Sequence, residues 1–148
     1  MNEFFIRWSP RLLSVLRIIT AFLFVEHGMQ KWLNFPAPAK AAATVMSLSG
    51  FAGLLELCGG ALLLLGLFSR SVAFVLSGLM ACAYFFAHAP RGFWPLLNRG
   101  ELAVLYCFVF LYLWAAGPGP WSLDAWLRSR KGQSGTDRVE RSEFLLNR

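Results

Sequence analysis

Apolar residues gather in four long runs, which are separated by short segments that contain proline, glycine or charged residues. The runs cover about residues 12–32, 48–68, 71–89 and 100–116. About 20 consecutive apolar residues are enough to cross a hydrocarbon core about 30 Å thick as an α-helix. Strands of a membrane barrel would alternate apolar and polar residues, and residues 61–65 do not alternate. The pattern therefore predicts an all-α membrane protein, a four-helix transmembrane bundle.

Composition and tryptophan positions support these spans. The chain is 57% hydrophobic and 15% charged, whereas soluble domains carry about 25% charged residues. All six tryptophans fall near or beyond predicted helix ends, where indole rings favour the headgroup zone of a bilayer. They are Trp8, Trp32, Trp94, Trp114, Trp121 and Trp126. The lipid bilayer is therefore the first partner that we expect.

Basic residues are distributed unevenly between the two sides of the membrane that four spans would define. One side holds Arg7, Arg11, Arg70, Arg128, Arg130, Lys131, Arg138, Arg141 and Arg148. The other side holds Lys31, Lys40, Arg91 and Arg99. Because cytoplasmic loops carry the excess of Lys and Arg, both termini are predicted to be cytoplasmic. We attribute the net charge of +6 to the basic residues on the cytoplasmic side and expect no nucleic-acid partner.

The chain divides into a four-helix transmembrane domain, residues 1–127, and a basic tail, residues 128–148. From about Lys131 onward the tail is polar and of mixed charge. Such segments cannot bury enough apolar surface to offset the entropy of ordering. We therefore expect the tail to be a disordered cytoplasmic segment.

Polar and ionisable residues inside the spans are the candidates for chemistry, because they are costly in a bilayer and usually face the bundle interior. In the first span, Arg17, His27 and Lys31 fall in one sector at helical spacing. Glu26 lies beside that sector, and Glu56 shares a face of the second span with glycines. The remaining candidates are Tyr84 and His88 in the third span and Glu101, Phe108 and Tyr112 in the fourth.

Alternating helix directions bring six ionisable residues to the outer half of the membrane. They are Glu26, His27, Lys31, Glu56, His88 and Glu101. Buried charges are tolerated only when paired, so we expect a polar cluster or small cavity, in which Glu56 pairs with His27 or Lys31. The alternative is that these residues only pair to lock the bundle together. None of them shows the Glu-x-x-His spacing of di-iron bundles, and no metal site is predicted.

The three cysteines stand singly on three different spans, at Cys58, Cys82 and Cys107. Helical geometry points each thiol away from the polar face of its own span. Buried cysteine commonly behaves as a small hydrophobe. We therefore expect no thiol relay.

Five segments, in this order along the chain, resemble the DoxX family. They are Arg17 with residues 22–24 (Phe-Leu-Phe), residues 27–31 (His-Gly-Met-Gln-Lys), residues 56–60 (Glu-Leu-Cys-Gly-Gly) leading to 64–70, residues 98–101 (Asn-Arg-Gly-Glu), and residues 117–124 (Gly-Pro-Gly-Pro-Trp-Ser-Leu-Asp). The resemblance covers about residues 12–127. It implies a small multi-pass protein of the bacterial inner membrane, in a family linked to membrane redox chemistry that involves quinones, thiosulfate or thiol stress.

Two functions follow. The first, which the resemblance favours, is an inner-membrane oxidoreductase, or a subunit of one, that binds a quinone in the outer cluster. Glu56 and His27 would then manage protons, and Tyr84, Phe108 and Tyr112 would cover the ring. The other binding residues would be Lys31, Glu26, Glu101, His88 and Arg17.

The second function is a non-catalytic adaptor that anchors soluble redox enzymes at the membrane or binds lipid in the same cavity. No flavin, haem or iron–sulfur motif is visible in the sequence, so no intrinsic cofactor is predicted. A quinone or a soluble redox partner protein is expected to carry electrons. The sequence leaves homo-oligomer formation open.

Overall fold

The computed structural model describes residues 2–37 and 47–131, and all regular structure in these two ranges is helical. Three helices are long and apolar enough to cross a membrane: α1 (Glu3–Leu33), α2 (Leu48–Leu65) and a continuous helical segment, Ser69–Arg91. A shorter apolar helix, α5 (Glu101–Ala116), has 16 residues, or about 24 Å at 1.5 Å per residue. The predicted helical membrane protein is confirmed, with three helices of spanning length rather than four.

The helix ends differ from the predicted span ends. Helix α1 begins at Glu3, before the predicted span, and includes Pro10. A helix can extend beyond the apolar segment that crosses the membrane. The third span is α3 (Ser69–Ala83), followed by a π-helical turn, η1 (Tyr84–His88), and a 3-10 turn, η2 (Ala89–Arg91). The short helix α4 (Pro95–Asn98) precedes α5.

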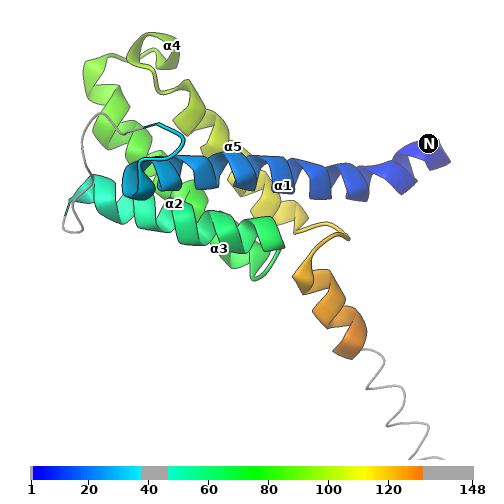
Figure 1. Ribbon diagram of the computed structural model, residues 1–148. Coiled ribbons are helices and arrows are strands. Elements are labelled where there is room, and N and C mark those ends of the chain that lie inside the picture. The colour runs from blue at the N-terminus through cyan, green and yellow to red at the C-terminus, as the bar shows by residue number, and fades with distance from the viewer. Residues whose placement is uncertain (1, 38–46, 132–148) are drawn as a thin grey trace, which may run out of the picture.

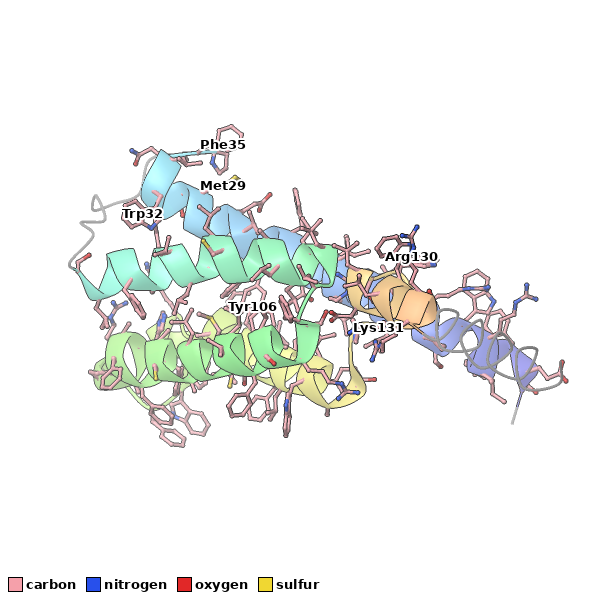
Figure 2. The ribbon with its side chains drawn as sticks, turned by 90° about the horizontal axis from the view of Figure 1, so that it is seen from below. Met29, Trp32, Phe35, Tyr106, Arg130 and Lys131 are labelled. Carbon is pink, nitrogen blue, oxygen red and sulfur yellow. The ribbon has the colours of Figure 1, made fainter. Side chains whose placement is uncertain are left out.

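The beginning of the predicted tail is helical. Residues 123–131 form a helix after the loop that follows α5. Figure 1 shows this helix projecting from the bundle, and Figure 2 shows that it lies at the same end as the start of α1. The rest of the predicted tail, residues 132–148, lies outside the described residues.

The four apolar helices pack as two pairs, α1 with α2 and α3 with α5, which form two layers in Figure 2. Glycines allow the first pair to approach closely. A Cβ added at Gly28 would lie 2.6 Å from the backbone nitrogen of Leu57, and one at Gly60 would lie 2.7 Å from the side chain of Val25. Small residues play this role at helix contacts in membranes.

One buried core joins the two layers. It consists of Ala21, Phe24, Leu63, Ala73, Leu76, Met80, Tyr106, Phe110 and Leu113. Large apolar residues on the outer faces, such as Phe22, Leu54 and Phe74, are half exposed. A protein that folds in lipid can expose such side chains, since the hydrocarbon around it is as apolar as they are.

Arg17 joins three segments at one end of the bundle, where its side chain is fully buried. Nη1 donates to the carbonyls of Leu63 and Leu64, at 2.5 and 2.7 Å. Nε donates to the carbonyl of Pro118 at 2.9 Å, and Nη2 donates to that of Trp121. The last carbonyls of a helix lack partners within it and carry partial negative charge. Arg17 therefore satisfies the end of α2 and fixes the loop after α5.

Asp124 closes the same end by capping α3. Its Oδ1 accepts a hydrogen bond from the Phe68 N–H at 2.9 Å, and its Oδ2 accepts one from the Ser69 N–H at 2.8 Å. Partial burial acts to raise the pKa of Asp124, but the hydrogen bonds from Ser69 and Phe68, with nearby Arg128, outweigh it and hold the pKa below its ordinary value. The carboxylate form of Asp124 therefore stabilises the fold.

Replacing Arg17 by lysine is expected to destabilise the protein although it keeps the charge. One ammonium group cannot replace the planar guanidinium group, whose N–H donors reach the end of α2 and the loop after α5. Each buried carbonyl left without a donor costs about 1–3 kcal/mol. We expect the free energy of unfolding in detergent to fall by about 2–5 kcal/mol, measured by denaturant titration. Arg7→Lys, at an exposed site of the same helix, is the control, and equal stabilities of the two variants would contradict this role.

Acid is expected to weaken the Asp124 cap. Because the folded-state pKa lies below the ordinary value of about 3.9, the stabilisation is complete above that value and is lost as the pH falls through the folded pKa. Asp124→Asn should flatten the acid limb of a thermal-stability profile measured between about pH 2 and 6. Glu3→Gln, at an exposed acid of the same end, should leave that limb unchanged. An identical profile for wild type and Asp124→Asn would refute the cap.

Candidate functional site

Glu56 and Lys31 form an ion pair between α1 and α2. Lys31 Nζ lies 2.6 Å from Glu56 Oε1, and Glu56 is 4% exposed. The other oxygen, Oε2, is buried and has no hydrogen-bond partner in the part of the chain that the structure describes. Lys31 follows Arg17 by 14 residues, or about 21 Å of helix, so this pair lies toward the opposite end of the bundle.

Glycines of α2 make room for this pair. A Cβ added at Gly53 would lie 3.1 Å from the Lys31 side chain, so a larger residue would push the lysine away. The carbonyl of Gly50 accepts a hydrogen bond from Trp32 Nε1 at 3.2 Å. Figure 2 shows Trp32 at the end of α1, beside the start of α2. The glycine spacing therefore sets where the end of α1 meets α2.

A groove of about 620 Å³ lies beside the pair, between α2 and α3, and Lys31 lines it. The other lining residues are Leu48, Ser49, Phe51, Ala52, Leu55, Val75, Leu79, Cys82, Ala83, Phe86 and Ala87. Ligand pockets commonly measure about 300–1,000 Å³ and combine apolar walls with few polar groups. The groove has this character, and Lys31 links it to Glu56.

His27 packs against Tyr106 rather than against the ion pair. Its ring meets that of Tyr106 edge to face, with centroids 6.1 Å apart. Tyr106 is 8% exposed and points between the two helix layers in Figure 2, where it contacts Phe24 and Phe110. Glu26, one residue before His27, is half-buried. The structure thus separates His27 and Glu26 from the ion pair.

Tyr84 and His88 hold the loop around α4. Tyr84 Oη donates to the carbonyl of Phe93 at 3.1 Å, and His88 Nδ1 lies 3.1 Å from the carbonyl of Asn98. That carbonyl can only accept, so Nδ1 carries the proton in this contact. Asn98 is fully buried and donates to the carbonyl of Gly92 at 2.8 Å. These predicted ligand residues therefore have structural partners.

The remaining predicted site residues lie apart from the ion pair. Glu101, Phe108 and Tyr112 occupy the exposed face of α5, while Arg17 is held by carbonyls at the opposite end. The predicted outer cluster is therefore three separate arrangements: the Lys31–Glu56 pair beside the groove, the His27–Tyr106 contact and the α4 loop network. No three metal-ligating side chains come together among the described residues.

Sequence reasoning missed Tyr106 and Asn98. It selected the face of α5 that carries Glu101, although Tyr106 shares the opposite face with Ala103, Phe110 and Leu113, which are all buried. A lone phenol on an otherwise apolar face was the available signal. Asn98 gave no comparable signal, because an asparagine before a glycine-containing turn is typical of an exposed loop.

Comparisons with known proteins identify the family of this chain. The DoxX family model matches residues 12–89. An uncharacterized protein of Haemophilus influenzae is 45% identical over 125 residues, which cover 80% of this chain and 92% of that protein. An uncharacterized membrane protein of Mycobacterium tuberculosis is 30% identical over 142 residues, covering 82% of this chain and 85% of its own. No solved structure matches. The chain belongs to the DoxX family and is a membrane protein.

Proposed function

We propose that this DoxX protein is a multi-pass protein of the bacterial inner membrane that binds a quinone-like ligand in the groove between α2 and α3. It would act as an oxidoreductase or as a subunit of one. The observation that carries the proposal is the geometry of Lys31, which lines the apolar groove and also holds the buried Glu56. Glu56 Oε2, with no hydrogen-bond partner among the described residues, leaves an acceptor free for a proton.

The groove suits a ring with carbonyl groups and an apolar tail. Lys31 can donate a hydrogen bond to a ring carbonyl, and the walls formed by Phe51, Val75 and Phe86 can pack against the ring and tail. The Glu56 carboxylate, 2.6 Å from Lys31 Nζ, holds the lysine side chain in place. The sequence suggested that three aromatic residues cover the ring. These residues, Tyr84, Phe108 and Tyr112, do not line the groove.

Reduction of a quinone to a quinol takes up two electrons and two protons. We assign the electrons to a soluble redox partner protein, and one proton to Lys31 Nζ. Lys31 would regain this proton from water at the outer surface, relayed by the Glu56 carboxylate across the 2.6 Å ion pair. Water at the outer surface supplies the second proton. The acid–base role falls on Glu56 and Lys31 rather than His27, because the His27 ring packs against Tyr106.

A second function, the membrane adaptor, is favoured by the helix of residues 123–131. This helix projects from the bundle in Figure 1 and carries exposed Arg128, Arg130 and Lys131. A basic helix of this kind can attract an acidic soluble enzyme. The adaptor function would need neither the groove nor Glu56.

The proposed topology has four crossings with both termini in the cytoplasm. A reporter fused after Arg148 is expected to be active on the cytoplasmic side, and one inserted near Lys40 on the outer side, because most basic residues that the structure describes lie at the end with the start of α1 and the helix of residues 123–131. Paired alkaline phosphatase and green fluorescent protein fusions measure this. Both reporters on one side of the membrane would exclude the four crossings.

Ligand binding is expected to depend on the ion pair. In lipid nanodiscs, Glu56→Gln and Lys31→Met should each weaken the binding of a short-chain ubiquinone analogue about tenfold or more, or about 1.4 kcal/mol. Quenching of tryptophan fluorescence measures the dissociation constant, since Trp32 lies next to the pair. Ala52→Phe should also weaken binding by filling the groove.

Glu101→Gln is the matched control, because it removes a carboxylate from the exposed face of α5. It should bind the analogue as wild type does. Unchanged binding by Glu56→Gln, Lys31→Met and Ala52→Phe, in protein that keeps its helical circular dichroism, would overturn the quinone proposal and leave the adaptor.

A further inference from the structure

A second cavity lies at the opposite end of the bundle from the groove. Its volume is about 530 Å³. The walls come from the first turns of α1, the end of α5, the loop at 117–120 and the helix of residues 123–131. The lining residues are Ser9, Pro10, Leu13, Arg70, Tyr112, Ala116, Pro118, Gly119, Pro120, Ala125 and Arg128.

Two arginines of this cavity have guanidinium groups that the protein uses only in part. Arg70 donates from Nη1 to the carbonyls of Trp114 and Ala115, at 2.6 and 2.7 Å. Arg128 donates from Nε to the carbonyl of Asp124 at 3.1 Å. Their remaining N–H groups have no hydrogen-bond partner within residues 2–37 and 47–131. Both arginines are thus held in place and retain donors for another acceptor.

Negative charge to match these arginines is scarce within the described residues. No carboxylate lines the cavity. Asp124 lines a smaller pocket beside it, together with both arginines, and its one negative charge leaves one of the two positive charges without a match. Guanidinium groups bind phosphate oxygens with paired hydrogen bonds. The cavity therefore favours an external anion, and a phosphate in particular.

The surroundings indicate that the anion belongs to a lipid. Trp114, Trp121 and Trp126 are about half exposed at this end of the bundle, and exposed indoles favour the depth of lipid headgroups. The cavity is also lined by apolar residues such as Leu13 and Ala116. A phosphate joined to acyl chains meets both parts of the cavity, whereas a free phosphate meets only the arginines.

We propose that the cavity between the start of α1 and the helix of residues 123–131 binds one anionic phospholipid, whose phosphate lies between Arg70 and Arg128. The lipid would tie that helix to the bundle at the membrane surface. Tyr112, which sequence analysis had assigned to the redox site, lines this lipid site instead. The proposal does not depend on the quinone function, because no residue is shared between the two cavities.

Native mass spectrometry of the purified full-length protein tests this site. Protein in a mild detergent is incubated with phosphatidylglycerol or with phosphatidylcholine of the same chain length. We expect wild type to retain one phosphatidylglycerol and little phosphatidylcholine. Arg128→Gln and Arg70→Gln should each lower phosphatidylglycerol retention about fivefold or more, about 1 kcal/mol.

Arg130→Gln is the matched control. Arg130 stacks on the ring of Trp126, 4.2 Å from its centroid, and does not line the cavity. It should retain phosphatidylglycerol as wild type does. Because Arg70→Gln also removes a cap from α5, Arg128→Gln decides the result if the first variant fails to fold. Soluble glycerol phosphate in excess should not displace the lipid.

Three outcomes would overturn the proposal. The first is equal retention of phosphatidylglycerol by wild type and Arg128→Gln. The second is equal retention of the two lipids by wild type, which would indicate only an apolar surface. The third is displacement of the lipid by excess glycerol phosphate, which would indicate a site for free anions.

Discussion

The fold depends on how the charge of Arg17 is accommodated inside the bundle. A buried guanidinium without partners would cost several kcal/mol, and α1 alone offers it none. Burial of this side chain is favourable only when the end of α2 and the loop after α5 supply carbonyls that accept its hydrogen bonds. Gly119, with φ of +75°, lets that loop lie against Ser14 and Pro10, where a Cβ would clash. One arginine therefore sets the register of α1 against two other segments.

That register determines the geometry at the far end of the bundle. Helix α1 is continuous from Glu3 to Leu33, so fixing Arg17 beside the end of α2 also fixes Lys31 beside Glu56, near the start of α2. Close contacts at Gly28 and Gly53 leave the two helices little freedom to slide. The groove beside Lys31 and the arginine cavity at the other end are thus two consequences of one packing arrangement.

Sequence reasoning succeeded where a pattern is local and failed where it depends on tertiary contacts. Apolar runs predicted the helices, and the expected cationic partner of Glu56 includes the one observed, Lys31. The role of Arg17 could not be predicted, because its partners are backbone carbonyls 46 to 104 residues away, which leave no trace in residue type. The buried face of α5 could not be identified from the sequence, since nearly every position of that helix is apolar and periodicity cannot distinguish its faces.

Photoaffinity labelling tests whether a quinone-like ligand binds beside Lys31. A quinone that carries a photoreactive azide on its ring would be added to the protein in nanodiscs, irradiated and mapped by peptide mass spectrometry. We predict labels within residues 48–55 and 75–87, the two segments that line the groove, and fewer labels when unlabelled quinone competes. Labels confined to other helices, or labels that unlabelled quinone does not reduce, would contradict it.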